Sequence, residues 1–496
     1  MDSDLMPFAS EGGKMRTAVL VSLFVLALVS PGCRKKNETP ETPTVPSGPL
    51  GGLKDTAHNF TSTAIDPDGD SVSLRFCWGD GDTSDWSSFA LSGESITMSH
   101  SWSMSGTHSI TAQGMDKKGD FSSWSDGHSM EIAPGLKWSK TFDSEDCDCG
   151  QEVQQTSDGG YVIVGNTSLY GESKSDIWLI KTDANGSKVW DRTFGGTSSD
   201  LGYSVQQTSD GGYVIGGSTR SYGAGNSDAW LVKTDGDGNE EWSRTFGETG
   251  YDGGVSVRQT SDGGYVVAGR KEIGGRECFW LVKSDAGGNT QWDKTYETPH
   301  WEWNRFCSVR QTSDGGYVAV GLCYVSDPSL RFGGIWLVKT DADGNMIWDK
   351  LFSKTTRYIV WSSVQQTSDG GYIVAGTKAE AGNDYDVWLI KTDANGDKVW
   401  DKTYGGDEWD EGLSVQQTVD GGYIVAGYTR SSGAGGQDFW LIKTDADGNK
   451  VWDATFGGTD GDCAHSVQLT SDNGYVMVGG TQSYGDKGGI WLVKVE

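Results

Sequence analysis

The chain has 496 residues, of which 73 are glycine and 22 tryptophan, and its formal net charge is −29. The aromatic content excludes a chain that is disordered throughout, because disordered sequences are poor in the large apolar residues that build a core. The excess of acidic over basic residues, 69 against 40, excludes the basic surface that nucleic-acid binding requires. Abundant glycine and aromatic residues with only 10 prolines favour short strands joined by tight turns, and so an all-β protein.

The N-terminal segment has the composition of an export signal followed by a tether. Basic residues precede an apolar run at 17–29, which is too short for a membrane span of ~20 residues. The run ends at Gly-Cys and resembles the lipobox of bacterial lipoproteins, which implies lipidation of Cys33. We expect a signal peptide at 1–33 and a proline-rich linker at 34–51, with Met15 as an alternative start. A plain secretory signal or an uncleaved anchor are the alternatives.

Residues 52–133 predict a small β domain of short alternating strands and turns. Its motifs resemble those of the PKD domain, an immunoglobulin-like sandwich of bacterial and archaeal surfaces. The motifs are DPDGD at 66–70, WGDGD at 78–82, SHSW at 99–102 and SGTHSITAQGMD at 105–116. The resemblance implies a spacer or adhesive module without catalysis.

Three carboxylates in the first of these motifs are candidate ligands for Ca²⁺. Asp66, Asp68 and Asp70 offer the oxygen atoms that this ion prefers. The alternative is that DPDGD only forms a tight turn, since Asp, Pro and Gly each favour turns. Both interpretations stay open, and no other cofactor is implied.

Residues 136–496 contain seven copies of one repeat. The tetrapeptide DGGY, once DNGY, begins at Asp158, Asp210, Asp262, Asp314, Asp369, Asp420 and Asp472, at spacings of 52, 52, 52, 55, 51 and 52 residues. A second motif, WL(I/V)K, recurs once in each repeat. Each repeat predicts four strands with hairpin turns, which is the blade of a β-propeller.

The ends of the repeat region predict how the ring closes. The fourth-strand motif first occurs as WSKTF at 138–142, before the first DGGY, and the last repeat stops after WLVKVE without it. The N-terminal strand should therefore complete the last blade and remove a free sheet edge. The predicted fold is an all-β chain: an immunoglobulin-like PKD sandwich plus a seven-bladed β-propeller closed by an N-terminal strand.

Two repeated residue types have structural interpretations. The two tryptophans of each repeat should fill the gaps between neighbouring blades. The lysine of each WL(I/V)K motif should pair with a neighbouring acid across the strands.

The loops that enter the first strand, and those that join the second and third strands, should share one face of the ring. Aspartates recur in both sets, and they either bind Ca²⁺ or a ligand, or cap their own loops. The repeat pattern breaks on this face, where aromatic and arginine residues typical of binding surfaces accumulate. The candidate ligand-binding residues are Trp301, Trp303, Arg305, Arg357, Tyr358, Trp361, Trp409 and Asp410.

Seven cysteines remain when Cys33 is set aside, so at least one thiol is unpaired. Cys149 and Cys463 occupy equivalent positions in the first and last repeats, which become neighbours when the ring closes. A disulfide between them would lock the ring, and Cys147 is a competing partner.

Catalytic motifs are absent from the sequence, which contains no HExxH, GxSxG, P-loop or CxxC pattern. The segment LIKTDANGDKVWDKTYGG at 389–406 resembles the repeats of quinoprotein dehydrogenases. Those proteins usually have eight blades and an adjacent cysteine pair, both missing here, which argues against a quinone site.

We therefore expect a non-catalytic binding or adhesion protein that recognises a glycan or a partner protein. A polysaccharide-degrading enzyme or a quinoprotein-type oxidoreductase is the alternative. The protein should be a monomer of the cell envelope, lipid-anchored and either surface-exposed or periplasmic, or else secreted. It should touch the membrane only through its N-terminal segment.

Overall fold

The computed structural model describes residues 36–143, 149–167, 175–297, 303–324, 333–355, 362–379, 385–485 and 488–496. Within these ranges the chain is all-β, and its elements are strands β1 to β34. No helical segment among the described residues could span a lipid bilayer. Cys33 and the apolar run before it lie outside the described residues.

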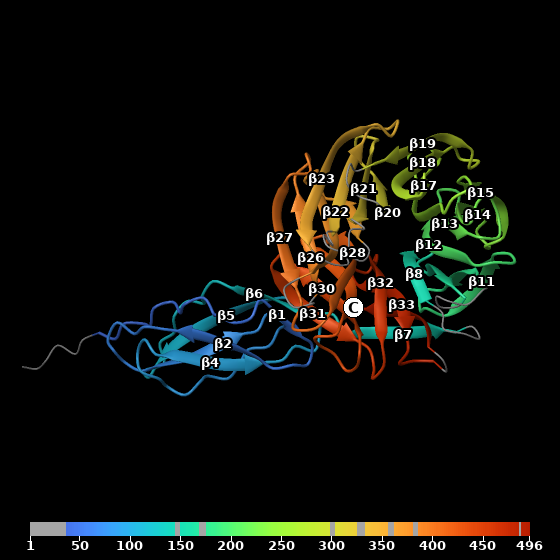
Figure 1. Cartoon of the computed structure of the whole chain (residues 1–496). Coiled ribbons are helices and arrows are strands. Elements are labelled where there is room, and N and C mark those ends of the chain that lie inside the picture. The colour runs from blue at the N-terminus through green and yellow to red at the C-terminus, as the bar shows by residue number, and fades with distance from the viewer. Residues whose placement is uncertain are drawn as a thin grey trace, which may run out of the picture.

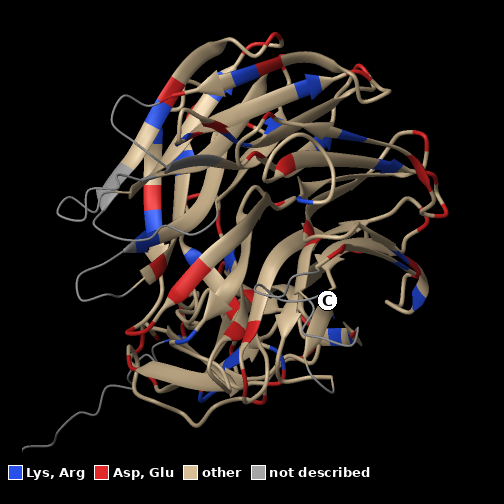
Figure 2. Cartoon of the chain, turned by 45° about the vertical axis from the view of Figure 1, so that its right-hand side comes forward, with Lys and Arg blue, Asp and Glu red and all other residues tan. Residues whose placement is uncertain are grey.

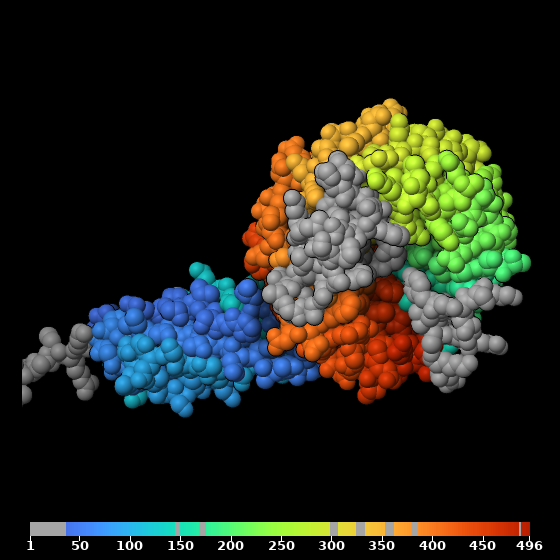
Figure 3. Space-filling model, in the orientation of Figure 1, coloured from blue at the N-terminus to red at the C-terminus, as the bar shows by residue number. Residues whose placement is uncertain are grey.

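The first six strands form a small domain that projects from the side of a larger ring of sheets (Figure 1 and Figure 3). Its strands pair as one four-stranded sheet in the order β1-β6-β5-β3 and one two-stranded sheet, β2-β4. Side chains from both sheets share one core, in which Trp102 donates its indole N–H to the Trp78 carbonyl at 3.1 Å. The strands are β1 Gly51–Leu53, β2 His58–Thr63, β3 Val72–Cys77, β4 Ser95–His100, β5 Gly106–Asp116 and β6 His128–Ala133.

The remaining strands form four-stranded antiparallel sheets, and the described residues contain seven of these. We number the sheets 1 to 7 in chain order. Sheet 1 is β8 Cys149–Gln155, β9 Tyr161–Asn166, β10 Ile177–Thr182 and β11 Lys188–Phe194. Sheet 2 is β12 Asp200–Gln207, β13 Tyr213–Thr219, β14 Asp228–Thr234 and β15 Glu240–Phe246. Sheet 3 is β16 Gly253–Gln259, β17 Tyr265–Ile273, β18 Arg276–Ser284 and β19 Thr290–Tyr296. Sheets 4 to 7 are β20 Trp303–Gln311, β21 Tyr317–Tyr324, β22 Gly333–Thr340 and β23 Met346–Thr355; β24 Ser363–Gln366, β25 Tyr372–Ala379, β26 Tyr385–Thr392 and β27 Lys398–Tyr404; β28 Asp410–Gln417, β29 Tyr423–Thr429, β30 Asp438–Thr444 and β31 Lys450–Phe456; β32 Asp462–Leu469, β33 Tyr475–Thr481, β34 Gly489–Val495 and β7 Leu136–Phe142.

The sheets close into a ring. Strand β7 pairs antiparallel with β34, as the sequence predicts, with Trp138 opposite Lys494. The first strands of successive sheets contact one another all the way round, including β32 against β8 (Figure 1). This is a propeller-like arrangement in which the first strand of each sheet lines the axis.

Aromatic pairs hold neighbouring sheets together, as the sequence predicts for the repeated tryptophans. The tryptophan of each fourth strand meets the DGGY tyrosine of the next sheet edge to face, for example Trp190 and Tyr213 with ring centroids 5.8 Å apart. The closing pair is Trp138 with Tyr161, also at 5.8 Å, which joins sheet 7 to sheet 1. The other pairs are Trp242–Tyr265, Trp292–Tyr317, Trp348–Tyr372, Trp400–Tyr423 and Trp452–Tyr475.

A buried lysine fastens the DGGY turn of each sheet to its third strand. In sheet 1, Lys181 Nζ lies 2.9 Å from Asp158 Oδ2 and donates to the Thr182 carbonyl at 2.8 Å. Burial raises the pKa of Asp158, but hydrogen bonds from Thr156 and Lys181 outweigh it and lower the pKa to about 2. The predicted pairing of the lysines with acids is confirmed, since the other pairs are Lys233–Asp210, Lys283–Asp262, Lys339–Asp314, Lys391–Asp369, Lys443–Asp420 and Lys494–Asp472.

The small domain packs against the ring where sheet 6 meets sheet 7. In sheets 1 to 6, the glycine of the turn between the third and fourth strands packs on the fourth-strand tryptophan of the preceding sheet, as Gly448 does on Trp400. Sheet 7 has no such turn, because its fourth strand is β7. The small domain takes its place: Trp452 donates its indole N–H to Glu131 Oε1 at 3.1 Å, and Gly51 contacts the Val451 carbonyl. Trp452 is therefore buried where its counterparts are half-buried.

Candidate ligand-binding site

The aromatic and arginine residues predicted from the sequence are only partly visible. Trp301, Arg357, Tyr358 and Trp361 lie outside the described residues. The backbones of Trp303 and Arg305 belong to strand β20, opposite Tyr324 and Leu322, and their side chains are not described. Their placement on a loop is therefore wrong, because the β20–β21 hairpin extends further than the repeat pattern suggests. All of these residues stay predictions as ligand contacts.

Trp409 precedes β28 and forms a stack on the surface of the ring. Its ring lies 4.9 Å from that of Tyr385 at an interplanar angle of 27°. The guanidinium of the exposed Arg430 lies 5.3 Å from the Trp409 ring centroid. Trp409 is half-buried in this stack, and the exposed guanidinium of Arg430 is the part of it that faces solvent.

Asp410 holds its own loop and is removed from the candidate set. Its side chain is fully buried, and Oδ2 accepts hydrogen bonds from the Ser431 hydroxyl at 2.7 Å and the Gly406 N–H at 2.9 Å. Asp200 is buried in the same way and accepts the equivalent two bonds, and the buried Asp462 accepts the Gly458 N–H at 2.9 Å. These aspartates are loop caps, because their carboxylate oxygens are already used by the backbone.

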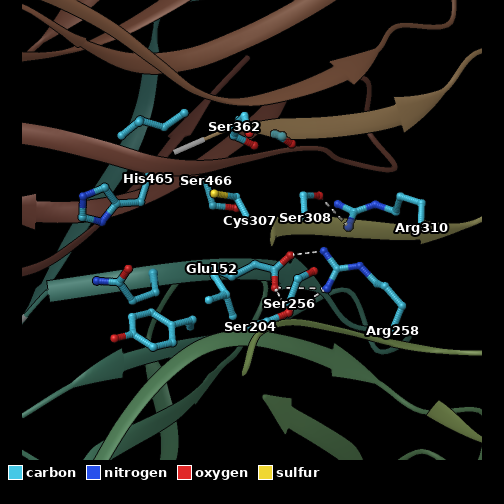
Figure 4. Close-up of a pocket in the computed structure, with 16 residues that line it drawn as sticks. Glu152, Ser204, Ser256, Arg258, Cys307, Ser308, Arg310, Ser362, His465 and Ser466 are labelled. Carbon is cyan, nitrogen blue, oxygen red and sulfur yellow. Dashed lines mark hydrogen bonds and ion pairs between the residues drawn. The ribbon is translucent and has the colours of Figure 1, made fainter. Parts of the chain in front are cut away.

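The central channel is lined by the first strands of all seven sheets (Figure 4). A β-bulge in most of these strands, such as that between Gly202 and Ser204, turns a serine toward the axis. The serine then accepts a hydrogen bond from the backbone of the next sheet, as Ser204 Oγ does from the Val257 N–H at 3.1 Å. The equivalent serines are Ser204, Ser256, Ser308, Ser363, Ser414 and Ser466.

A second ring of side chains links the sheets two residues further along each first strand. Gln206 Oε1 accepts from the Gln259 N–H at 2.8 Å, and Gln416 Oε1 accepts from the Leu469 N–H at 2.9 Å. The recurring tetrapeptide SVQQ therefore links neighbouring sheets, because its serine and its first glutamine each accept a backbone hydrogen bond from the next sheet.

The repeat pattern breaks at three charged residues of the channel. Glu152 stands in place of the serine in sheet 1, and Arg258 and Arg310 stand in place of the glutamine in sheets 3 and 4. Glu152 forms a two-point ion pair with Arg258, and its Oε2 also accepts the Ser204 hydroxyl at 2.7 Å. Arg310 donates to the Val309 carbonyl at 2.8 Å.

The charges of the channel shift each other's pKa values. Burial raises the pKa of Glu152, but the charges of Arg258 and Arg310 and the hydrogen bond from Arg258 outweigh it and lower the pKa. Burial and the charge of Arg258 together lower the pKa of Arg310 to about 9, although the charge of Glu152 opposes both. One carboxylate thus faces two guanidinium groups.

A cluster of thiols and imidazole adjoins the channel at the seam between sheets 7 and 1. His465 lines the channel, with Nδ1 2.9 Å from the Gly150 carbonyl, while Cys149 Sγ lies 3.4 Å from Nδ1 and Cys463 Sγ 3.7 Å from Nε2. The hydrogen bond from Cys149 lowers the pKa of Cys463, and the charge of His465 lowers it further. The side chains of Cys149 and Cys463 are hydrogen-bonded to each other, and their disulfide stays a prediction. Cys147 lies outside the described residues.

The aspartates proposed for Ca²⁺ form the tight turn that was the alternative interpretation. Asp66 Oδ1 accepts the N–H groups of Asp68 and Asp70 at 2.9 and 3.1 Å. Asp70 forms an ion pair with Lys118 at 2.8 Å, and Asp68 accepts the Glu38 N–H at 2.8 Å. Asp66 Oδ2 is buried without a hydrogen-bond partner, and Ca²⁺ takes six to eight oxygen ligands. Ca²⁺ binding here stays a prediction.

A second group of possible metal ligands in the small domain was missed by sequence reasoning. Ligand atoms of Asp80, Asp82 and His100 lie within 4.8 Å of one another. His100 Nε2 lies 2.7 Å from Asp80 Oδ2, and its ring stacks on Trp78 at 4.9 Å. His100 and Asp80 thus form an imidazole–carboxylate pair.

Comparisons with known proteins give weak likenesses. No protein-family model matches the chain. The regulatory protein FlaEY of Caulobacter vibrioides is 26% identical over 136 residues, which cover 24% of this chain and 14% of that protein. The chain thus spans about a seventh of that relative's length.

Two solved structures also give weak likenesses. The PKD domain of an M14-like peptidase from Thermoplasmatales archaeon SCGC AB-540-F20 is 33% identical and covers 19% of this chain and 97% of its own, with a TM-score of 0.18. A protein of unknown function from Dyadobacter fermentans is 12% identical and covers 73% of this chain and 99% of its own, with a TM-score of 0.43. At these TM-scores the likenesses carry no argument about function.

Proposed function

We propose that the chain is a non-catalytic binding protein: a seven-bladed β-propeller carried on a PKD-like, immunoglobulin-like module. Its ligand is a glycan or a partner protein, and it docks over the mouth of the central channel. The protein acts outside the cell, lipid-anchored through Cys33 on the cell surface or in the periplasm, or secreted. It acts as a monomer and touches the membrane only through its N-terminal segment, and Ca²⁺ is its one candidate ion.

The observation that carries the proposal is the position at which the repeat breaks. Duplication alone would leave the same serine and glutamine in every first strand. Instead the charged substitutions Glu152, Arg258 and Arg310 gather at the axis, where side chains from several sheets converge on one ligand. Arg430, stacked on Trp409, offers a further cation and aromatic surface on the ring.

The channel chemistry supports binding rather than glycoside hydrolysis, the enzymatic alternative. Hydrolysis of a glycosidic bond usually needs two carboxyl groups, one of them a general acid with a raised pKa. Among the described residues that line the channel, Glu152 is the one carboxylate. It is ion-paired with Arg258 and its pKa is lowered, which is the opposite of what a general acid requires.

A screen of the soluble chain from residue 36 onward on a glycan array, with and without Ca²⁺, tests the proposal. We expect binding to a small set of related glycans, with dissociation constants that calorimetry can measure. Silence on the array together with no partner in a cross-linking experiment on intact cells would overturn the proposal. Release of reducing sugar from a bound polysaccharide would instead favour the enzyme.

A further inference from the structure

Two arginines occupy channel positions where the repeat otherwise has glutamine. In sheet 2 this glutamine, Gln206, accepts the N–H of Gln259 from the next sheet at 2.8 Å. A guanidinium has donors but no acceptor, so Arg258 and Arg310 cannot make this link. Sheets 3 and 4 therefore lose an inter-sheet hydrogen bond and gain a positive charge at the axis.

The charge of the second arginine is not balanced. Glu152 holds Arg258 in a two-point ion pair, with the Ser204 hydroxyl and the Val205 N–H on the same carboxylate at 2.7 and 2.9 Å. Arg310 is bonded to neutral groups, the Val309 carbonyl and, at 3.4 Å, the Ser308 hydroxyl. Among the described residues, no carboxylate forms an ion pair with it. The acidic residues of this chain, whose net charge is −29, are spread over many sheets and turns (Figure 2), whereas its channel holds an excess positive charge (Figure 4).

The space beside these groups is small and polar. The channel cavity has a volume of about 90 Å³, several times what one water molecule needs. A carboxylate group or a small oxyanion fits this space. Serine hydroxyls from Ser256, Ser308 and Ser363 line the same cavity and can donate to an anion.

We infer that the channel binds the carboxylate or small oxyanion end of a ligand between the Arg310 guanidinium and the serine hydroxyls. Arg310 supplies the charge and a planar pair of N–H donors that matches a carboxylate. Glu152 keeps Arg258 in a fixed position and removes one of the two positive charges. The inference rests on the proposed function, and it gives the ligand of that function an anionic end.

Two substitutions that restore the repeat give opposite expectations, and both should fold because the other sheets already carry these residues. Arg310→Gln removes the unbalanced charge. Glu152→Ser removes the carboxylate and leaves Arg258 unpaired. Arg276→Gln, an exposed site on the β17–β18 hairpin, is the matched control.

Titration calorimetry of the chain from residue 36 onward, at constant ionic strength, measures the effect with sulfate, glucuronate and, as the neutral control, glucose. We expect the unsubstituted protein to bind sulfate or glucuronate with one site per chain, and glucose at least tenfold more weakly. Arg310→Gln should weaken anion binding about tenfold or more, and Glu152→Ser should strengthen it severalfold. Arg276→Gln should leave it unchanged.

The choice of ligands distinguishes a free oxyanion from a carboxylate on a larger molecule. The choice of variants distinguishes failure of the anion site from failure of the proposed function. Binding of sulfate but not glucuronate supports a free oxyanion as ligand, and tighter binding of glucuronate supports a carboxylate on a larger molecule. Anion affinities that stay within twofold in both channel variants would overturn the inference. A neutral glycan that binds equally to the unsubstituted protein and to Arg310→Gln would leave the proposed function standing and overturn the anionic end alone.

Discussion

At the scale of single residues, most charged side chains of the repeat are used to hold turns and strands. The lysine of each third strand is buried, while its aspartate partner is about half exposed, for example Lys339 at 5% and Asp314 at 59%. Such a pair depends on the carboxylate staying ionised, so it links stability to pH.

Acid should weaken this set of pairs together. Burial raises the pKa of Asp314, and hydrogen bonds from Thr312 and Lys339 lower it to about 2 from the ordinary 3.8. Its contribution is complete above pH 3.8 and is lost as the pH falls toward 2. Urea unfolding followed by tryptophan fluorescence should show a steep loss of stability in this window. Asp314→Asn should lose about 1 kcal/mol at pH 7, a value reduced by solvent screening, and should show a shallower acid slope. Asp343→Asn, on the exposed neighbouring turn, is the control, and an unchanged acid slope in Asp314→Asn would contradict the account.

The thiol next to the channel should be unusually reactive. The hydrogen bond from Cys149 and the charge of His465 lower the pKa of Cys463, whereas burial raises that of Cys278. Because the thiolate is the nucleophile, iodoacetamide at neutral pH should label Cys463 well before Cys278. His465→Ala should slow the labelling of Cys463, and equal rates for the two cysteines would contradict this. Peptide mapping without reductant tests the predicted disulfide between Cys149 and Cys463.

At the scale of strands and sheets, the first strands carry both the fastening of the ring and its candidate site. The two roles compete at Arg310, because a glutamine there would accept a hydrogen bond from the next sheet and an arginine cannot. Arg310→Gln should therefore raise the free energy of unfolding by about 0.5–1.5 kcal/mol, the usual net value of one hydrogen bond. Thermal unfolding without ligand measures this, and a variant less stable than the unsubstituted protein would show that the arginine is itself structural.

The seam between sheets 6 and 7 makes the small domain part of the ring's stability. Trp452 packs on the small domain, in the position where other sheets present a turn. Deleting residues 1–133 should expose the indole ring of Trp452. The free energy of unfolding should fall by about 2 kcal/mol, or Tm by about 5 °C.

A double-mutant cycle isolates the contact at the seam. Trp452→Ala should be much less harmful in the shortened chain than in the full one, because its partner is already gone. Trp400 is covered by a turn of the next sheet instead. Trp400→Ala should therefore lower the free energy of unfolding equally in the full and the shortened chain. Equal losses for Trp452→Ala in both chains would contradict the role of the small domain.

How far the sequence predicts the structure depends on the range of each interaction. Hairpins, the turn chemistry of DGGY and the lysine–aspartate pairs lie within one repeat, so periodicity alone predicts them. The link between Ser204 and Val257 joins different sheets, and no spacing in the sequence reveals it. The loop position of Asp410 predicts a ligand contact, but its burial depends on how the loop folds back, which the sequence does not show.

Periodicity does not single out the channel residues, because each occupies an ordinary strand position of the repeat. Their signal is present in the sequence as departures from the SVQQ consensus, SVRQ at Arg258 and Arg310 and EVQQ at Glu152. What the sequence does not contain is the distance between them, since Glu152 and Arg258 are 106 residues apart and meet only after closure. The same holds for the seam, where the chain brings the small domain to Trp452.

At the scale of the whole molecule, a ring of sheets is closed by its own N-terminal strand, contacts a small domain at one side and carries charged departures from the repeat at its axis. The repeat explains the glycines, the tryptophans and most of the acidic residues as structural. We propose that function lies where the repeat is broken, and three of these departures, Glu152, Arg258 and Arg310, meet at the axis.

The most direct test of this account is a crystal structure of the chain from residue 36 onward, grown with millimolar glucuronate. The account predicts density for the carboxylate in the channel, within hydrogen-bond distance of the Arg310 guanidinium, and an intact Glu152–Arg258 ion pair. Glucuronate bound only elsewhere on the ring, with Arg310 bonded to protein atoms alone, would contradict it.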